Sequence, residues 1–331
     1  MESVTVLLSV YNGLPFLADT LESLKRQHHR AFRACVVDNA SDDGSAELLA
    51  RMGDERFRVV RARDNLGIPQ NFNRAFDLVE TPYFALVHQD DVYEPEFLGA
   101  MLELIERYPA AFIAHSKVEP IDEAGAPFFV RAERYKERFW PREDPYERGP
   151  ADGVQALGEG NYVVMPTVMY RTAAVRRIGP FAKEYRFLSD WQYWIRGLLA
   201  GFSIAGTHRK LVRRRWHRGM GTRTAEADGS RYGEEVAITE WIARAAHEAG
   251  FRPTPTADYS RVMNLVLDDF ARRLAGGHEA DARRLLALAG ERVPGFKGSS
   301  RELAARTAAR LGRFGGSCLE LAGAAYVRVS S

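Results

Sequence analysis

Two adjacent carboxylates stand at the end of an apolar run in the segment LVHQDDVYEP, residues 86–95. Asp90 and Asp91 repel each other, because each carboxylate is more stable when it is solvated or paired with a positive charge. Such a pair at the end of a strand indicates a site that holds a cation. Helix capping is the alternative, since Asp is favoured near a helix N-terminus and Pro95 suits a first helical turn. Capping explains one of the two carboxylates well and the other poorly.

Polar residues also follow other apolar runs of the sequence. Tyr11 and Asn12 come at the end of VTVLLSVYN, and Asp38 and Asn39 come at the end of RACVVDN. Parallel α/β sheets bind their ligands beyond the carboxyl ends of the strands. We therefore expect these loops and the Asp90–Asp91 loop to form one binding edge.

The elements that would carry these loops are predicted from hydrophobic periodicity. From residue 4 to about 115, short apolar runs alternate with segments of helical period. The predicted strands cover residues 4–10, 33–38, 56–61 and 83–88. One predicted helix follows the turn at 13–15. The others cover residues 43–52, 68–78 and 95–107. This order predicts an α/β fold with a mostly parallel, Rossmann-like sheet flanked by helices.

The pattern changes after residue 115. Residues 118–130 are typical of two strands joined by a turn that contains Gly125. Residues 139–161 are rich in Pro and Gly and are predicted to form a long loop. Helical periods return around residues 230–290, which predicts a C-terminal helical extension.

Composition excludes several classes of protein. The chain has 331 residues, 46% of them apolar, and 46 basic against 44 acidic residues, a formal charge of +2. This balance gives no support for nucleic-acid binding. Cys35 and Cys318 are far apart and lack the spacing of a disulfide framework or zinc site. The N-terminus does not resemble a signal peptide, and no apolar stretch is long enough for a membrane span, so we expect a cytoplasmic protein, with contact to the inner membrane face left open.

Five blocks of the sequence, in order, resemble the family 2 glycosyltransferases with the GT-A fold. They are VTVLLSVYNG, VVDNASDDGS, RDNLGIPQNFNRAF, VHQDDVYEP and FLSDWQYWIR. The resemblance covers about residues 3–220. It implies a nucleotide-sugar-binding half over residues 1–115 and an acceptor-binding half over 116–220, followed by the helical extension over 221–331.

The resemblance implies a nucleotide diphosphate sugar as donor and Mn²⁺ or Mg²⁺ as cofactor, because the leaving pyrophosphate needs its charge neutralised. Asp91 matches the expected metal ligand of the family's DXD-type element, and Asp90 is placed toward the ribose or the metal. His88 stands where the first carboxylate of the fuller motif often lies. His217, in the basic run RRRWHRG, matches a further metal ligand. That run either closes over the diphosphate or is a solvated strand edge.

The same resemblance assigns a set of nucleotide-binding residues. Asp38 would accept a hydrogen bond from the imide of uracil or thymine, and Tyr11 would stack beside the base unless it is an ordinary aromatic residue at a strand end. The expected set is Ser9, Tyr11, Asn12, Asp38, Asn39, Asn65, Gly67, Asn73 and Asp90.

Asp190, in LSDWQYWIR, matches the family's catalytic base, which takes the proton of the acceptor hydroxyl. Ser189 replaces the Glu of the family's E-D element. The alternative is that Asp190 caps the helix that follows it. Trp191 and Trp194 are expected on the acceptor side, as a dry wall and a stacking surface for a sugar ring.

The C-terminal segment has two interpretations. Arg306, Arg310 and Arg313 flank an apolar stripe formed by Leu311, Phe314, Cys318 and Leu321. This face either meets an anionic membrane as a peripheral contact or packs on the catalytic domain or a second subunit as a homo-oligomer.

Together these features predict a metal-dependent, inverting, non-processive hexosyl- or deoxyhexosyltransferase. It would move a sugar from a UDP- or dTDP-linked donor to a saccharide or lipid-linked acceptor in bacterial surface polysaccharide or glycoconjugate synthesis. The rivals are a non-catalytic nucleotide-sugar-binding module, which would lack the base Asp190, and a sugar nucleotidyltransferase, which would need a Gly-rich basic loop where this chain has SVYNGLPFL.

Overall fold

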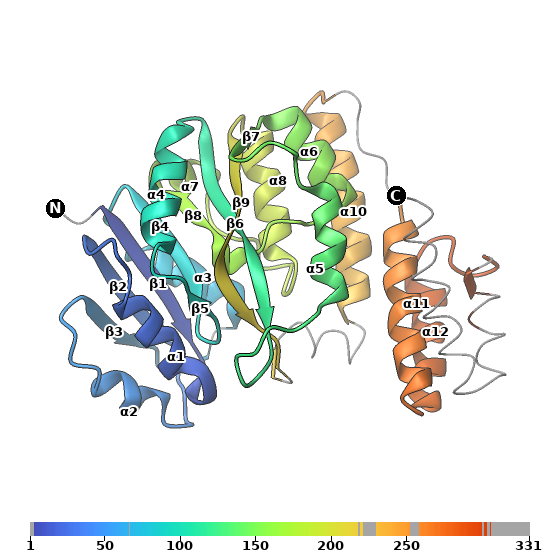
Figure 1. The fold of residues 1–331 in the computed structure, drawn as a ribbon. Coiled ribbons are helices and arrows are strands. Elements are labelled where there is room, and N and C mark those ends of the chain that lie inside the picture. The colour runs from blue at the N-terminus through green and yellow to red at the C-terminus, as the bar shows by residue number, and fades with distance from the viewer. Residues whose placement is uncertain are drawn as a thin grey trace. The chain divides into compact units, whose positions relative to one another are not determined.

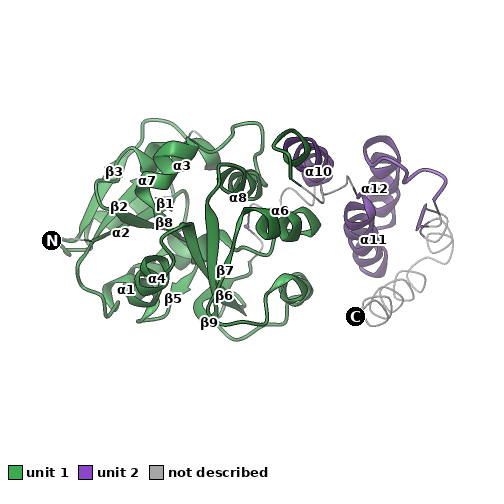
Figure 2. Ribbon diagram, turned by 90° about the horizontal axis from the view of Figure 1, so that it is seen from above, with its two compact units in different colours: residues 1–217, 246–255 green, residues 218–245, 256–331 purple. Residues whose placement is uncertain are grey.

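The structure is a computed structural model that describes residues 3–65, 67–217, 219–220, 230–251, 258–299, 301–302 and 305. Two compact units are present (Figures 1 and 2). The first contains residues 1–217 and 246–255, and the second contains residues 218–245 and 256–331. The first unit holds the sheet and all of the residues discussed below as a functional site.

One half of the nine-stranded sheet is parallel and carries the predicted binding edge. Its strands, in spatial order, are β3 (Phe57–Arg61), β2 (Phe32–Asp38), β1 (Val4–Val10) and β4 (Tyr83–His88). Val10 pairs with Asp38, and Ser9 pairs with His88. Because β1, β2 and β4 end at the same level, the polar residues that follow them meet at one edge of the sheet.

The other half of the sheet is mixed. It contains β8 (Met169–Arg171), β6 (Ala111–Ile121), β9 (Ser203–Arg215), β5 (Val92–Tyr93) and β7 (Tyr146–Arg148). β6 and β9 are parallel to each other, whereas β5, β7 and β8 pair antiparallel with their neighbours. β6 runs across residue 115, where the sequence placed the boundary between donor and acceptor halves. The predicted α/β fold with flanking helices is confirmed.

Helices cover both faces of the sheet, as Figure 2 shows for α1 and α4 on one face and α3, α7 and α8 on the other. Their bounds are α1 Leu14–Lys25, α2 Ser45–Ala50, α3 Ile68–Phe76, α4 Phe97–Arg107, α7 Thr172–Ile178 and α8 Ser189–Leu199. α1 buries Leu17, Leu21 and Leu24 along one stripe. The apolar face that the helical period predicts therefore packs into the core. α8 is more fully embedded, because most of its residues are buried.

Two sequence predictions in the middle of the chain are wrong. After β6 the chain makes only an isolated bridge between Ile121 and Pro127 instead of a second strand, and α5 (Arg131–Lys136) follows. The predicted loop at 139–161 contains the strand β7 and the helix α6 (Pro150–Glu159). Three of its Pro and Gly residues mark the ends of α6: Gly149 precedes the helix, Pro150 occupies its first turn and Gly160 follows its last residue.

The second unit is helical, as predicted for the C-terminal extension. It contains α11 (Ser260–Ala275), α12 (Glu279–Arg292) and most of α10 (Ser230–Glu248). Its core includes Tyr232, Val266, Phe270 and Leu285. The Tyr232 hydroxyl donates a 2.8 Å hydrogen bond to Asp269, which satisfies a buried polar pair inside this core.

Among the described helices, none is both long enough and apolar enough to cross a bilayer. The apolar stripe from Leu311 to Leu321 and its arginines lie outside the described residues. The two interpretations of that segment therefore stay as stated.

Candidate active site

The last residue of β4 and the loop after it form a three-residue cluster. His88, Asp90 and Asp91 each offer one ligand atom, and these atoms all lie within 4.8 Å of one another. Nε2 of His88 is buried and has no hydrogen-bond partner. A buried nitrogen acceptor beside two carboxylates is the donor set of a divalent cation site, so these residues fit a bound metal.

Asp91 is the most enclosed member of the cluster. It is 2% exposed, and Oδ1 accepts a 2.9 Å hydrogen bond from the backbone N–H of Arg215. Burial, together with the negative charge of Asp90, raises the pKa of Asp91 well above its ordinary value. A cation at the cluster would offset both effects, which supports the prediction of Asp91 as a metal ligand.

Asp90 has a different environment from its neighbour. Burial opposes its ionisation, but the hydrogen bond from His217 and the nearby His88 outweigh this and lower the pKa of Asp90. Nε2 of His217 lies 2.9 Å from Oδ2 of Asp90, and the His217 ring packs at 4.7 Å from the ring of Phe16. The cluster therefore contains His88, and His217 contacts it through Asp90. His217 as a direct metal ligand stays a prediction.

The loop after β1 is held to the metal loop by one side chain. Gln89 accepts a 2.7 Å hydrogen bond from the backbone N–H of Tyr11 and donates a 2.9 Å bond to the Tyr11 carbonyl. A side chain at Gly13 would overlap the Gln89 amide, since a Cβ there would lie 2.6 Å from Oε1. Tyr11 is 46% exposed, as a stacking residue requires. The sequence reasoning overlooked Gln89.

Asp38 lies at the end of β2 and is fully buried. Oδ1 accepts a 3.1 Å hydrogen bond from the Ser41 N–H, and Oδ2 lies 3.3 Å from Nε of Arg61 without a hydrogen bond of its own. Oδ2 thus keeps acceptor capacity, which the proposed bond from a pyrimidine imide needs.

The loops beside Asp38 are fixed by side-chain amides. The Asn39 amide donates to Asn65 at 2.7 Å, and Asn65 accepts from the Gly67 N–H at 2.9 Å. Gly67 has a φ of 74°, in the region that favours glycine. Asn12, with a φ of 49°, donates to Asp42 at 2.9 Å. The structure therefore brings the predicted residues 12, 39, 65 and 67 to the edge that carries Asp38.

Helix α3 supplies two asparagines with different contacts. Asn71 is buried and donates to the Ser9 hydroxyl at the end of β1. Asn73 accepts a 2.8 Å bond from the Phe181 N–H and donates a 3.0 Å bond to its carbonyl. Both polar atoms of the Asn73 side chain hold the chain before α8, and Asn73 as a nucleotide contact stays a prediction. The sequence reasoning passed over Asn71.

Asp190 lies in the first turn of α8 and faces a polar environment. Oδ1 accepts a 2.6 Å bond from the Trp191 N–H, and Oδ2 accepts a 3.4 Å bond from Asn161. Burial raises the pKa of Asp190 to about 6, although these bonds and the charges of Lys136 and Arg214 oppose the rise. A carboxylate with this pKa is ionised at neutral pH and is a stronger base than an ordinary Asp.

Arg214 connects the surroundings of Asp190 with those of the metal cluster. Its Nη1 lies 2.6 Å from Oε1 of Glu133 on α5, and the same oxygen lies 3.0 Å from Nζ of Lys136. The positive charge of Arg214 lowers the pKa of Asp190 and also partly offsets the raised pKa of Asp91. The two carboxylates therefore lie within electrostatic reach of one guanidinium.

The two tryptophans of α8 do not provide the expected sugar surface. Trp191 is 1% exposed and Trp194 is fully buried. The Trp191 N–H donates 2.8 Å to the Leu157 carbonyl, and Trp194 packs near the rings of Phe112 and Tyr170. Because both indoles are buried, the prediction that a sugar ring stacks on them is wrong. Their role is to anchor α8.

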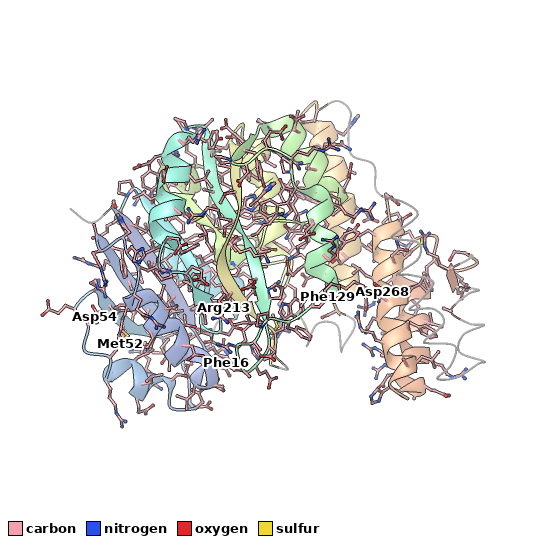
Figure 3. The ribbon with its side chains drawn as sticks, in the orientation of Figure 1. Phe16, Met52, Asp54, Phe129, Arg213 and Asp268 are labelled. Carbon is pink, nitrogen blue, oxygen red and sulfur yellow. The ribbon has the colours of Figure 1, made fainter. Side chains whose placement is uncertain are left out.

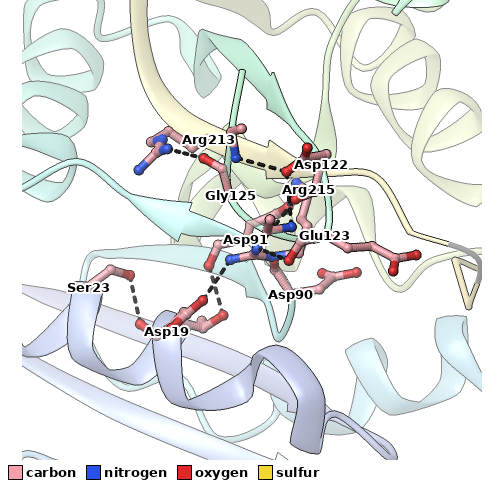
Figure 4. A network of polar contacts seen from close by, with 12 residues as sticks. Asp19, Ser23, Asp90, Asp91, Asp122, Glu123, Gly125, Arg213 and Arg215 are labelled. Carbon is pink, nitrogen blue, oxygen red and sulfur yellow. Dashed lines mark hydrogen bonds and ion pairs between the residues drawn. The ribbon is translucent and has the colours of Figure 1, made fainter. Parts of the chain in front are cut away.

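The arginines at the end of β9 are held in a network of polar contacts (Figure 4). The Arg215 side chain donates to the Asp90 carbonyl at 3.1 Å and the Glu123 carbonyl at 2.9 Å, and pairs with Asp19 at 2.8 Å. Arg213 donates to the Gly125 carbonyl. The alternative interpretation of the run as a solvated strand edge is therefore wrong for these arginines. Arg218 lies outside the described residues.

Comparison with known proteins decides the family. The family profile described as "Glycosyl transferase family 2" matches residues 5–179, more than half of the chain. The chain belongs to glycosyl transferase family 2. This confirms the resemblance noted in the sequence.

Individual relatives of this family are distant. The chain is 25% identical over 248 residues to protein y4gI of Sinorhizobium fredii. This match covers 73% of the chain and 25% of y4gI. It is 30% identical over 111 residues to the putative teichuronic acid biosynthesis glycosyltransferase TuaG of Bacillus subtilis, over 33% of the chain and 44% of TuaG. The chain thus corresponds to less than half the length of either relative.

Solved structures of S. aureus TarS share the fold. For TarS residues 1–349 in complex with UDP-GlcNAc the TM-score is 0.57 at 17% identity, over 86% of this chain and 83% of that one. The family 2 chain described here therefore has the predicted GT-A fold.

Proposed function

We propose that the chain is a metal-dependent, inverting, non-processive glycosyltransferase. It moves a sugar from a UDP- or dTDP-linked donor to a hydroxyl of a saccharide or lipid-linked acceptor. The observation that carries the proposal is the position of Arg214, whose charge acts both on Asp91 in the metal cluster and on the candidate base Asp190. One guanidinium within electrostatic reach of both carboxylates supports a single site that takes the donor at the cluster and the acceptor hydroxyl at Asp190.

The donor side is built from the edge of the parallel strands. Tyr11 offers an exposed ring for the base, and Asp38 keeps one buried acceptor oxygen. Asp90, Asp91 and His88 would hold Mn²⁺ or Mg²⁺. When bound, this cation neutralises the diphosphate charge that develops as the leaving group departs.

The acceptor side supplies the proton acceptor. Asp190, whose pKa is raised to about 6, takes the proton of the acceptor hydroxyl as its oxygen bonds to the anomeric carbon. The bond between that carbon and the diphosphate oxygen breaks on the opposite face, with inversion and no covalent intermediate. Before the reaction, the positive charge of Lys136 stabilises the ionised form of the Asp190 carboxylate.

Relatives support a role in bacterial surface glycans. TuaG is named for teichuronic acid biosynthesis, and a teichoic acid poly(glycerol phosphate) polymerase of Staphylococcus epidermidis is 31% identical over 94 residues, 28% of the chain. TarS was solved with UDP-GlcNAc, which supports including UDP-sugars among the donors to be tested. We infer polysaccharide or glycoconjugate synthesis as the setting of this chain.

Nucleotide release tests the proposal. A panel of UDP-, dTDP- and GDP-sugars, each with and without Mn²⁺ and with a mixture of saccharide acceptors, should give release for one nucleotide class that depends on the metal. Asp190→Asn should bind this donor and fail to transfer. Full transfer by Asp190→Asn would refute the assignment of Asp190 as the base. Metal-independent turnover would refute the assignment of the metal site.

A further inference from the structure

An apolar pair stands on the surface of the loop between β6 and α5. Phe128 is 46% exposed and Phe129 is 75% exposed. The other large apolar side chains exposed in the described part of the chain are Tyr11, Leu14 and Val59, and Phe129 is the most open of all five. Figure 3 labels Phe129 among the drawn side chains. Two neighbouring exposed phenylalanines cost solvation free energy, so a partner is expected.

The loop that carries this pair is fixed to the edge of the donor site. The Phe128 N–H donates 2.9 Å to the Pro120 carbonyl, and the turn at Gly125 has a φ of 84°. Arg215 then joins the loop to the metal cluster, since it bonds both the Glu123 and the Asp90 carbonyls (Figure 4). The phenyl groups are therefore displayed from a fixed base beside the predicted site.

The residues after the pair are cationic. The sequence PFFVRAERYKER, residues 127–138, contains four basic and two acidic side chains, a net charge of +2. Arg131 and Arg134 are exposed on α5. Arginine beside exposed aromatic residues suits a surface that is apolar inside and anionic outside.

We propose that Phe128 and Phe129 insert into the outer part of an anionic phospholipid bilayer, with the arginines of α5 against the lipid phosphates. Two side chains at a loop tip form too small a patch for a stable protein interface, which needs about 800 Å² from each partner. A bilayer needs no matching surface and accepts a narrow apolar tip. The loop would then hold the active-site edge at the membrane, where a lipid-linked hydroxyl is presented.

Vesicle sedimentation tests this surface without any sugar transfer. The probes are vesicles of phosphatidylcholine alone and of phosphatidylcholine with one quarter phosphatidylglycerol. The wild-type chain should bind the anionic vesicles, more weakly at 0.5 M salt and on the neutral vesicles. The double variant Phe128→Ser/Phe129→Ser should bind at least tenfold more weakly. Val59→Ser, which changes an exposed apolar residue of β3, is the matched control and should bind like the wild type.

Three results would overturn the proposal. Wild-type protein that stays in the supernatant has no such surface, and a double variant that binds equally well uses another one. Light scattering that finds a wild-type dimer and a monomeric double variant assigns the pair to a second copy of the chain. Equal thermal midpoints for wild type and double variant would show that any lost binding is not due to unfolding. Failure here would leave the proposed sugar transfer intact, because the assay contains no donor.

Discussion

Replacement of Asp190 by Asn should remove sugar transfer and, at the same time, make the protein more stable at high pH. The carboxylate is partly enclosed, and burial raises its pKa from 3.8 to about 6. A raised carboxyl pKa means that the folded state prefers the protonated form. The associated stability is fully present below pH 3.8 and is lost as the pH rises through about 6. Asn does not ionise and does not pay this cost.

The size of the effect follows from the shift. Roughly two pH units at 1.36 kcal/mol each give about 3 kcal/mol. Partial exposure of the side chain to water reduces this to about 2 kcal/mol. For a unit of about two hundred residues this corresponds to a rise in the thermal midpoint of roughly 4 to 8 °C.

Thermal unfolding of both proteins at pH 5 and pH 8 measures the effect. The gain for Asp190→Asn should be about half of its full size at pH 5 and close to its full size at pH 8. In the wild type, transfer should rise with pH around a midpoint near 6, since the base must be ionised. Asp152→Asn provides the control, because Asp152 lies exposed in the first turn of α6. A gain that is equal at both pH values, or a variant that still transfers sugar, would refute the reasoning.

Three further substitutions test the loops around the metal cluster. Asp91→Ala removes a buried oxygen ligand, so calorimetry should find no Mn²⁺-dependent donor binding, and unchanged binding would argue against the metal role. Gln89→Ala deletes both hydrogen bonds to the Tyr11 backbone. It should raise the donor KM about tenfold, and kinetics in which only kcat falls would contradict a positioning role. Arg215→Met removes the hydrogen bonds to the Asp90 and Glu123 carbonyls and the ion pair with Asp19, and urea unfolding should find a loss of about 3 kcal/mol. An unchanged midpoint would mean that these bonds contribute little.

The parallel half of the fold could be predicted because each of its signals is local. A strand such as β1 (Val4–Val10) is a continuous apolar run, and α1 repeats its leucines with helical period, so sequence alone defines both. The region after β6 mixes short elements with turns. β7 has only three residues and pairs with β9, more than fifty residues later in the chain, so no local pattern announces it.

The candidate site could be predicted in part for the same reason. Asp90 and Asp91 stand out because two carboxylates end an apolar run. His88 was visible at the end of that run, but its part in the cluster depends on a side-chain direction that only the fold provides. Trp191 was misjudged because aromatic residues beside a candidate base suit both a binding surface and a core. Burial decides between these roles. It comes from α6, whose Leu157 carbonyl accepts the hydrogen bond of the Trp191 indole.

The buried tryptophans of α8 have a consequence for the choice of product. Since both indoles are locked in the core, the backbone beneath Asp190 has little freedom to follow a substrate. Under the proposed function, which hydroxyl of a sugar ring becomes glycosylated is then determined by how the acceptor lies against the protein, and the base selects only the oxygen that reaches it. Changes in regiochemistry should therefore arise from substitutions of residues that contact the acceptor, while α8 keeps its position.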